Sequence, residues 1–203
     1  WMVHSFPTRR SSDLKKECVA AAYRQGGKQQ ARDYYENTLF QSLREAHRVT
    51  KPGGILIVVY AHKTTLGWAT LVDAMRRAGY EVAEAWPLTT ETKARIAHQG
   101  DAALASSIFL VARRREAPEV GSYEEQVRSD LEKIVRERVD SLWKMGIAGA
   151  DLVIAAVGAG LRAFTRFSRV EYANGDEVPA EKFLAEVEGV VLETLLEKIF
   201  GVT

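Results

Sequence analysis

The sequence predicts a mixed α/β fold in which a sheet region is followed by a mostly helical module. In the first part of the chain, runs of β-branched residues alternate with stretches of helical periodicity. Pro118 and Gly121 mark a linker, and beyond it the pattern is helical apart from one hairpin signal. The charge divides at the same place, because residues 1–116 carry 18 Lys and Arg against 11 Asp and Glu, whereas residues 117–203 carry 10 against 16. We therefore expect a basic sheet region over residues 15–116 and an acidic helical module over residues 117–203.

The composition excludes several classes of protein. The chain has 203 residues, of which 46% are hydrophobic, so a disordered or collagen-like chain is excluded. The single cysteine, Cys18, excludes a disulfide framework and a zinc site built from several thiolates, and it favours a reducing, cytoplasmic setting. The most apolar run covers only 10 residues, 152–161, whereas a membrane-spanning helix needs roughly 20. We therefore expect no membrane segment.

Residues 1–14 are set aside from the fold prediction. They have no periodicity, and residues 5–14 resemble the translation of a sequencing adapter. On that interpretation the chain is a truncated gene product whose natural N-terminal part is missing. The alternative interpretation is an ordinary disordered tail.

The sheet region opens with a helix, a strand and a second helix. Residues 30–49 have apolar positions at helical spacing, and Pro52 with Gly53 ends that helix. Residues 55–60 form a continuous apolar run, which predicts a buried strand covered on both faces. The second helix is expected to end near Ala78, before Gly79.

Two further strands complete the predicted sheet. Residues 80–86 alternate between apolar and polar, and Pro87 is expected to end this strand. A polar loop over residues 88–103 precedes a strand over residues 107–111. Because no helix separates the last two strands, we expect them to pair antiparallel at the side of a parallel, doubly wound sheet.

The helical module is predicted to contain three helices and a hairpin. The first helix covers residues 123–144, Asp151 caps the second, and the third follows Pro179. Asn174 and Gly175 provide the hairpin signal. The side chains expected to face the core are Val127, Leu131, Ile134, Val135, Val139, Leu142 and Trp143 of the first helix, and Phe183, Leu184, Val187, Val191, Leu195 and Ile199 of the third.

One motif in this module matches the sequence pattern of a cofactor-binding loop. Residues 158–163 match G-x-G-x-x-A after an apolar run, as in loops that bind a dinucleotide or S-adenosylmethionine. No complete strand–helix–strand unit follows the motif. We therefore favour a helix rich in small residues that packs closely against its neighbours. No two histidines have ligand spacing on one element, so we predict no metal site.

The candidate binding residues follow the predicted strands. Four polar residues come where a central strand ends, and ligands of open α/β sheets bind at such carboxyl ends. These residues are His62, Lys63, Thr64 and Thr65. Capping of the next helix is the alternative role for the two threonines. The polar loop over residues 88–103 is long for a compact domain, which is typical of a functional loop or of a surface excursion.

Several stretches resemble one family of enzymes. Residues 40–54 are similar to the helix and Lys-Pro-Gly-Gly element of S-adenosylmethionine-dependent methyltransferases. Residues 60–68, 86–91 and 103–108 resemble the C-terminal half of large prokaryotic adenine-specific DNA methylases. The resemblance covers approximately residues 15–200.

This resemblance implies the C-terminal half of a Rossmann-like methyltransferase sheet with an antiparallel last hairpin. It also implies methyl transfer from S-adenosylmethionine to a DNA base, the N6 of adenine, after the base is flipped from the duplex. The family's glycine-rich cofactor loop and its D-P-P-Y-type tetrapeptide are absent from this chain. The nearest match to the tetrapeptide is Asp33, Tyr34 and Tyr35, which lacks the two prolines and lies in a helical pattern. Both elements would precede residue 15. No catalytic residue is therefore assigned, and the chain alone is expected to be inactive.

The family's pocket wall does map onto this sequence. Lys63, Lys93 and Arg95 are expected to contact DNA phosphates. Trp68 is expected to lie in the hydrophobic core rather than to stack on a base. Two alternative functions are a non-enzymatic nucleic-acid-binding or assembly module and a small-molecule methyltransferase. The acidic helical module is expected to bind a protein partner. The candidates for the pocket or the DNA contact are His62, Lys63, Thr64, Thr65, Thr90, Glu91, Lys93, Arg95 and Ser106.

Overall fold

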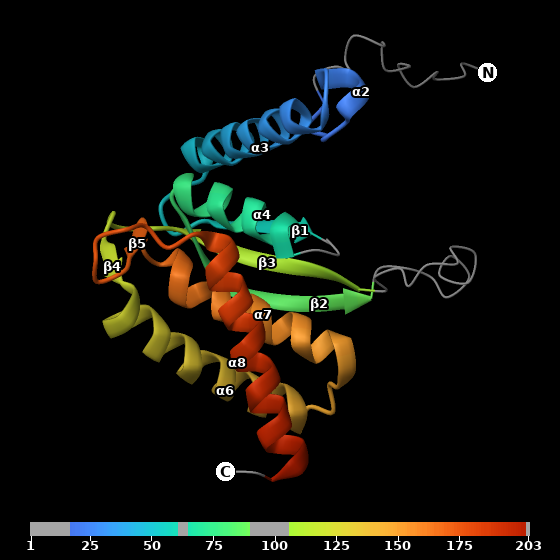
Figure 1. Ribbon diagram of the computed structural model, residues 1–203, viewed down its shortest axis with the longest axis vertical. Coiled ribbons are helices and arrows are strands. Elements are labelled where there is room, and N and C mark those ends of the chain that lie inside the picture. The colour runs from blue at the N-terminus through green and yellow to red at the C-terminus, as the bar shows by residue number, and fades with distance from the viewer. Residues whose placement is uncertain (1–16, 61–64, 90–105, 202–203) are drawn as a thin grey trace, which may run out of the picture.

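The sheet region consists of a helical layer and three strands (Figure 1). The computed structural model describes residues 17–60, 65–89 and 106–201. Within them this region contains the elements α2 (Ala22–Gln25), α3 (Lys28–Val49), β1 (Ile55–Tyr60), α4 (Thr65–Arg77), β2 (Tyr80–Thr89) and β3 (Ser106–Arg114). The predicted strand over residues 55–60 and the two helices around it are therefore confirmed.

The three strands form an antiparallel sheet in the order β1-β3-β2. The expected antiparallel pairing of the last two strands, β2 and β3, is confirmed. The expected parallel, doubly wound arrangement is not seen among the described strands, because β3 lies between β1 and β2 and runs against both. As a result β1 and β2 run in the same direction without being neighbours, and α4 connects them.

Strand β2 does not end at Pro87, as the sequence predicts, but continues to Thr89. Pro87 lies opposite Ile108 in the ladder. Because β2 is an edge strand of this sheet, one side of its backbone has no strand partner, and a residue without an N–H group is tolerated there.

Strand β1 is covered on one face only, so the prediction of cover on both faces is wrong for the described residues. Leu56, Val58 and Tyr60 pack against the core. The alternate side chains Ile55, Ile57 and Val59 are 54%, 50% and 54% exposed. The helices α4 and α7 both pack on the inner face of the sheet, so that neither covers the outer face of β1.

The helical module confirms the three predicted helices. Its elements are β4 (Val120–Ser122), the π-helical turn η1 (Tyr123–Val127), α6 (Arg128–Lys144), α7 (Gly149–Thr165), β5 (Arg169–Glu171) and α8 (Ala180–Phe200). Helix α7 begins at Gly149, so Asp151 lies in its first turn and is not its cap. The tight turn at Asn174 and Gly175 is confirmed by a bridge between Glu171 and Glu177.

Three further predictions about this module are wrong. The linker expected around Gly121 contains the strand β4, which pairs in parallel with β5. Trp143 and Ile199, expected in the core, are both exposed. Their helical spacing is that of core residues, but Trp143 and Ile199 lie at the C-terminal ends of α6 and α8, where their side chains are 41% and 57% exposed.

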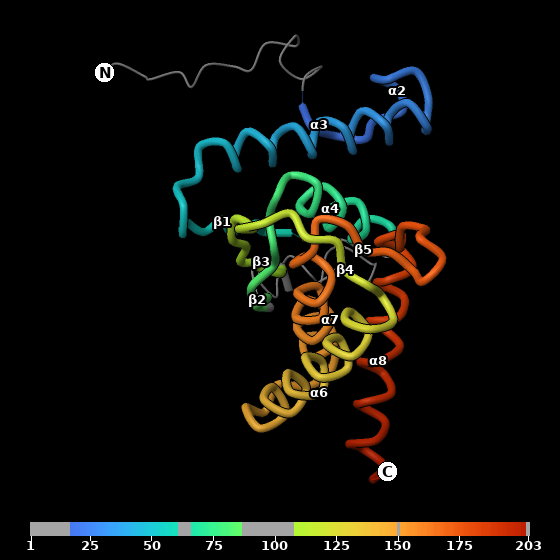
Figure 2. Tube along the Cα trace, turned by 90° about the vertical axis from the view of Figure 1, so that its left-hand side faces the viewer, coloured from blue at the N-terminus to red at the C-terminus, as the bar shows by residue number. Residues whose placement is uncertain are grey.

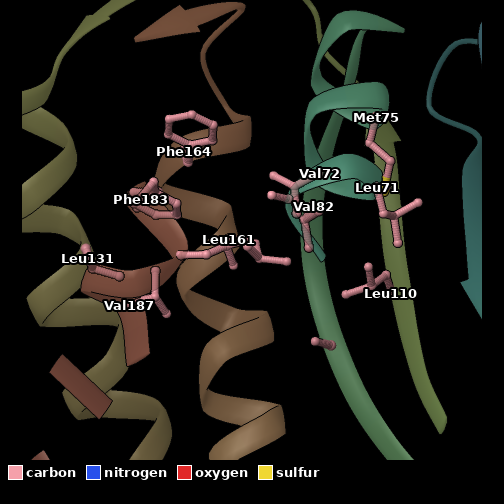
Figure 3. Close-up of a cluster of buried hydrophobic side chains, with 14 of the residues drawn as sticks. Leu71, Val72, Met75, Val82, Leu110, Leu131, Leu161, Phe164, Phe183 and Val187 are labelled. Atoms are coloured by element: carbon pink, nitrogen blue, oxygen red, sulfur yellow. The ribbon is translucent and has the colours of Figure 1, made fainter. Parts of the chain in front are cut away.

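Both regions share one hydrophobic core, with α7 at its centre (Figures 2 and 3). Leu71 and Val72 of α4 lie near Val82 and Leu110 of the sheet in Figure 3. On the other side of α7, the rings of Phe164 and Phe183 stack with centroids 4.5 Å apart. The sheet region and the helical module are therefore packed as one body.

The glycines of the G-x-G-x-x-A motif allow this close packing. The motif lies inside α7, as the packing interpretation predicts. A Cβ atom on Gly158 would lie 2.3 Å from the Cβ of Ala85, and one on Gly160 would lie 2.7 Å from Val187 Cγ1. The absence of side chains at these two positions thus lets α7 approach β2 on one side and α8 on the other.

Candidate functional site at the carboxyl edge of the sheet

The ends of several elements meet at one edge of the sheet. Tyr60, the last residue of β1, lies opposite Ile108, and Thr89, the last residue of β2, lies opposite Ser106. The carboxyl ends of β1 and β2 and the start of β3 therefore lie side by side. Helix α4 begins five residues after Tyr60, at Thr65, so its start belongs to the same edge.

Two of the nine predicted site residues fall in the described structure. Thr65 is the first residue of α4 and Ser106 is the first residue of β3. Their backbones stand at the carboxyl edge, where the sequence predicts the binding site. The other seven lie outside the described residues: His62, Lys63, Thr64, Thr90, Glu91, Lys93 and Arg95.

An aromatic cluster supports the backbone beside this edge. The rings of Tyr60 and Trp68 meet edge to face with centroids 5.1 Å apart, and the Tyr60 hydroxyl donates to the carbonyl of Gly67 at 2.9 Å. Trp68 packs on the core, as the sequence predicts. Burial raises the pKa of Tyr60, and the nearby Tyr35 raises it further, so this phenol stays protonated as a donor.

Sequence reasoning did not assign Tyr35 and Tyr60 to the site. Tyr35 comes from α3 and Tyr60 from the last position of β1, so only the folded chain places them together. The sequence offered one signal for Tyr60, which is that a tyrosine ends an otherwise aliphatic strand. The cluster joins the last residue of β1 to the first turns of α4.

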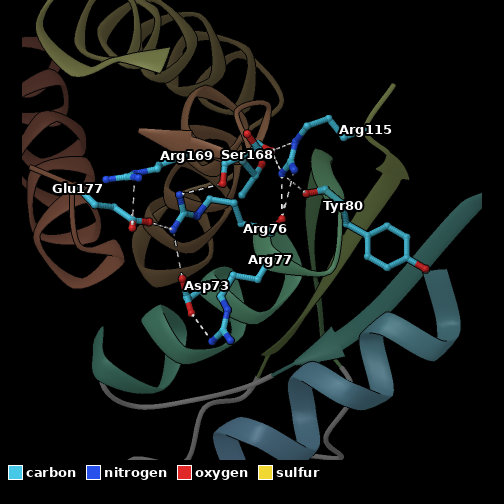
Figure 4. Close-up of polar contacts among 9 residues, drawn as sticks. Asp73, Arg76, Arg77, Tyr80, Arg115, Ser168, Arg169 and Glu177 are labelled. Atoms are coloured by element: carbon cyan, nitrogen blue, oxygen red, sulfur yellow. Dashed lines mark hydrogen bonds and ion pairs between the residues drawn. The ribbon is translucent and has the colours of Figure 1, made fainter. Parts of the chain in front are cut away.

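A second polar cluster lies where the sheet region meets the helical module (Figure 4). The Arg115 guanidinium donates to the carbonyl oxygens of Arg76, Tyr80 and Thr165, at distances of 2.7–3.3 Å. These three carbonyls lie at the end of α4, the start of β2 and the end of α7. Burial lowers the pKa of Arg115 to about 10, and the neighbouring charge of Arg76 adds to this effect.

Arg76 is the partner of Arg115 in this cluster and is itself buried, with 4% of its surface exposed. It donates to the carbonyl of Ser168 at 3.2 Å and pairs with Asp73 at 3.3 Å and Glu177 at 2.5 Å. Its guanidinium also lies over the ring of Phe164. The two arginines connect α4, β2, α7 and the β5 segment, so we assign them a structural role.

Two grooves flank the arginine cluster. One, of about 690 Å³, is lined by Arg77, Arg169 and Glu181 among others, and the second, of about 650 Å³, by Gly53, Arg114 and Arg166 among others. Three of the cations in these walls are engaged within the protein: Arg77 pairs with Asp73, Arg114 donates to the Thr50 carbonyl, and Arg166 pairs with Asp130. These three cations therefore already have partners within the protein.

The described residues do not supply a cofactor loop or a metal site. The G-x-G-x-x-A motif is helical, and the side chains of Ala85 and Val187 occupy the space beside its glycines, so it offers no cradle for S-adenosylmethionine. No group of three His, Cys, Asp or Glu in the described part of the chain is arranged to hold a metal ion. None of the helices in that part is long and apolar enough to cross a membrane.

The comparisons with known proteins found no relative. No family model, no curated protein and no solved structure matches this chain. The functional argument therefore depends on the sequence and the geometry described above.

Proposed function

We propose that the chain is the C-terminal part of a methyltransferase that transfers a methyl group from S-adenosylmethionine to a DNA base, the N6 of adenine. The carboxyl edge of the sheet would form one wall of the pocket for the flipped base. We assign no catalytic residue to this chain, and the G-x-G-x-x-A motif of α7 offers no cofactor loop, so we derive no chemical step for this chain alone.

The sheet is the observation that carries this proposal. An antiparallel last hairpin, β2 and β3, is what the sequence resemblance implies, and it follows a strand–helix–strand connection from β1 through α4 to β2. The carboxyl edge of these strands is also where ligands of open α/β sheets bind.

The state of β1 also supports the proposal. Its six side chains are all apolar or aromatic, a composition typical of strands inside a sheet that is covered on both faces. Among the described strands, however, β1 is an edge strand with an exposed outer face. It has no charge, proline or bulge of the kind that protects natural sheet edges. A further strand and helix of a longer protein would cover both the edge and the face.

The predicted residues have distinct roles in this proposal. Lys63, Lys93 and Arg95 contact the phosphates of the DNA backbone as point charges. The other predicted residues form the pocket wall. The positions of Thr65 at the start of α4 and of Ser106 at the start of β3 support this role.

The gene upstream of residue 15 provides the first test. We expect it to encode a glycine-rich strand–turn–helix and an Asp/Asn-Pro-Pro-Tyr sequence. The protein from the whole reading frame should methylate adenine in duplex DNA, and Lys63→Ala should reduce its DNA binding or turnover. Absence of both upstream elements, or of methyl transfer by the longer protein, would contradict the proposal.

The chain alone provides the matching control. It should transfer no methyl group and show no tight binding of S-adenosylmethionine by calorimetry. Tight cofactor binding would show that we have misplaced the cofactor site. Tight, steeply salt-dependent binding of duplex DNA by a chain whose longer form is inactive would instead favour the non-enzymatic nucleic-acid-binding module.

A further inference from the structure

The C-terminal helix α8 is apolar on two opposite sides. Its inner side is buried against the neighbouring helices through Phe183, Val187 and Val191. In both views α8 lies on the outside of the helical layer (Figures 1 and 2). Its outer side nevertheless carries a second apolar row, which we call the outer seam and which consists of Ala185, Gly189, Leu192, Leu196 and Ile199.

The outer seam is exposed along its whole length. Leu192, Leu196 and Ile199 are 59%, 46% and 57% exposed. A Cβ atom on Gly189 would meet nothing within 4 Å. A helix that is apolar all round normally has neighbours all round, so the packing of the described residues does not account for this row.

The spacing of the outer seam is that of a coiled coil. Its five residues follow one another in alternating steps of four and three, which is the a/d pattern of a heptad repeat. This row is narrower than the stripe with which a helix packs on a globular core. The seam is therefore suited to a single partner helix. Lys182 occupies the step before Ala185, so the apolar row begins at Ala185.

The charges beside the outer seam disfavour a second copy of this chain as the partner and favour a basic helix. Over residues 181–193, acidic residues occupy both rims, at the positions that face the partner helix in a coiled coil. A second copy of this chain would bring glutamate against glutamate, whether the two helices ran parallel or antiparallel. Lysine and arginine on a different helix would instead be attracted. The rim residues are Glu181 and Glu188 on one side, and Glu186 and Glu193 on the other.

We propose that the outer seam of α8 is the docking surface for a basic amphipathic helix of a partner protein. The partner places leucine or isoleucine in the seam and lysine or arginine along its rims. This inference does not depend on the methyltransferase proposal, because it uses only the exposure, spacing and charge of α8.

Two synthetic peptides test this proposal. Both have three heptads with leucine at the a and d positions; one carries lysine and the other glutamate at the rim positions. Fluorescence anisotropy with the full chain should show the lysine peptide binding at least about tenfold more tightly than the glutamate peptide. The difference should shrink as the salt concentration is raised, because exposed charges are screened.

Variants of the rims provide the sharper control. Glu186→Lys, Glu188→Lys and Glu193→Lys together should invert the preference, so that the glutamate peptide binds more tightly. The matched variant with Glu124→Lys, Glu132→Lys and Glu137→Lys has the same net charge, lies on η1 and α6, and should keep the original preference. Circular dichroism checks that both remain folded.

The seam itself is tested by Leu192→Ser with Leu196→Ser, which should abolish binding of either peptide. Both leucines are exposed, so these changes leave the core intact. Equal affinity for the two peptides, or no binding of the lysine peptide, would overturn the proposal. A dimer of the chain that this variant dissociates, detected by sedimentation equilibrium, would also overturn it.

Discussion

At the scale of single residues, His47 couples two elements through an aromatic contact. It lies near the end of α3, edge to face with Tyr80 at the start of β2, with centroids 5.2 Å apart. Its Nε2 lies 3.0 Å from the position that a Cβ on Gly79 would take. Burial lowers the pKa of His47, and the positive charges of Arg114 and Arg115 lower it further.

This environment predicts a pH dependence of stability. Because the folded-state pKa of His47 is below the ordinary value of 6.5, the unfolded chain takes up the proton first as the pH falls. The free energy of unfolding should therefore decrease as the pH falls below 6.5, and a neutral replacement should remove this part of the decrease. Melting temperatures of the wild type and His47→Gln between pH 7 and pH 5 check this, and parallel curves for the two proteins would contradict it.

At the scale of elements, the same residue type has opposite roles in two helices. Gly158 of α7 packs on Ala85, whereas Gly189 of α8 faces open space. Gly189 contributes nothing to the packing and lowers the stability of its own helix. The close approach of α7 to the sheet, in contrast, depends on the missing side chain of Gly158.

One substitution at both positions should therefore have effects of opposite sign. Gly158→Ala should lower the melting temperature, because overpacking costs about 1–3 kcal/mol and exceeds the gain in helix propensity. Gly189→Ala should raise the stability by about 1 kcal/mol, the difference in helix propensity between the two residues. Urea unfolding of both variants measures the changes. A stabilising Gly158→Ala would show that α7 can move away from β2 without loss.

The strand β1 shows the same dependence on surroundings. Its apolar sequence predicts burial on both faces, yet the described structure covers one. The outer seam of α8 is a second apolar surface without a neighbour. In our proposals the exposed face of β1 is covered by a further part of a longer protein, and the outer seam of α8 by a helix of a partner protein.

At the scale of the whole molecule, the sheet region and the helical module have a common core. Buried side chains from α4, β2, β3, α6, α7 and α8 belong to one cluster. Arg115 adds polar contacts between the ends of α4 and α7 and the start of β2. The change of charge and composition between the two regions therefore does not coincide with a break in the packing.

We therefore expect the two regions to unfold in a single transition. Tryptophan fluorescence reports on both, through Trp68 and Trp86 in the sheet region and Trp143 in the module, and should coincide with circular dichroism. Arg115→Met should lower the midpoint of both signals together, at a cost of about 1–3 kcal/mol for the carbonyls that lose a donor. Two separate transitions, of which only one responds to Arg115→Met, would show independent domains.

The candidate site was predictable in part from the sequence. Polar residues after an apolar run predicted a site that includes Thr65, and the family resemblance added Ser106. The backbones of both lie at the carboxyl edge of the sheet. The cluster of Tyr35, Tyr60 and Trp68 was not predictable, because its members come from three elements whose mutual positions are set by packing.

The sequence by itself determined most of the helices and strands, since helical periodicity, apolar runs and the positions of glycines are properties of neighbouring residues, but it missed the short strand β4. It predicted β1, α6 and α8, and it identified the glycine motif of α7 as a packing element. Only the tertiary structure decided that β3 lies between β1 and β2, and that Trp143 and Ile199 are exposed. The physical reason is that a pattern shows which side chains can be buried, whereas the non-local packing of helices and strands decides which of them find a neighbour.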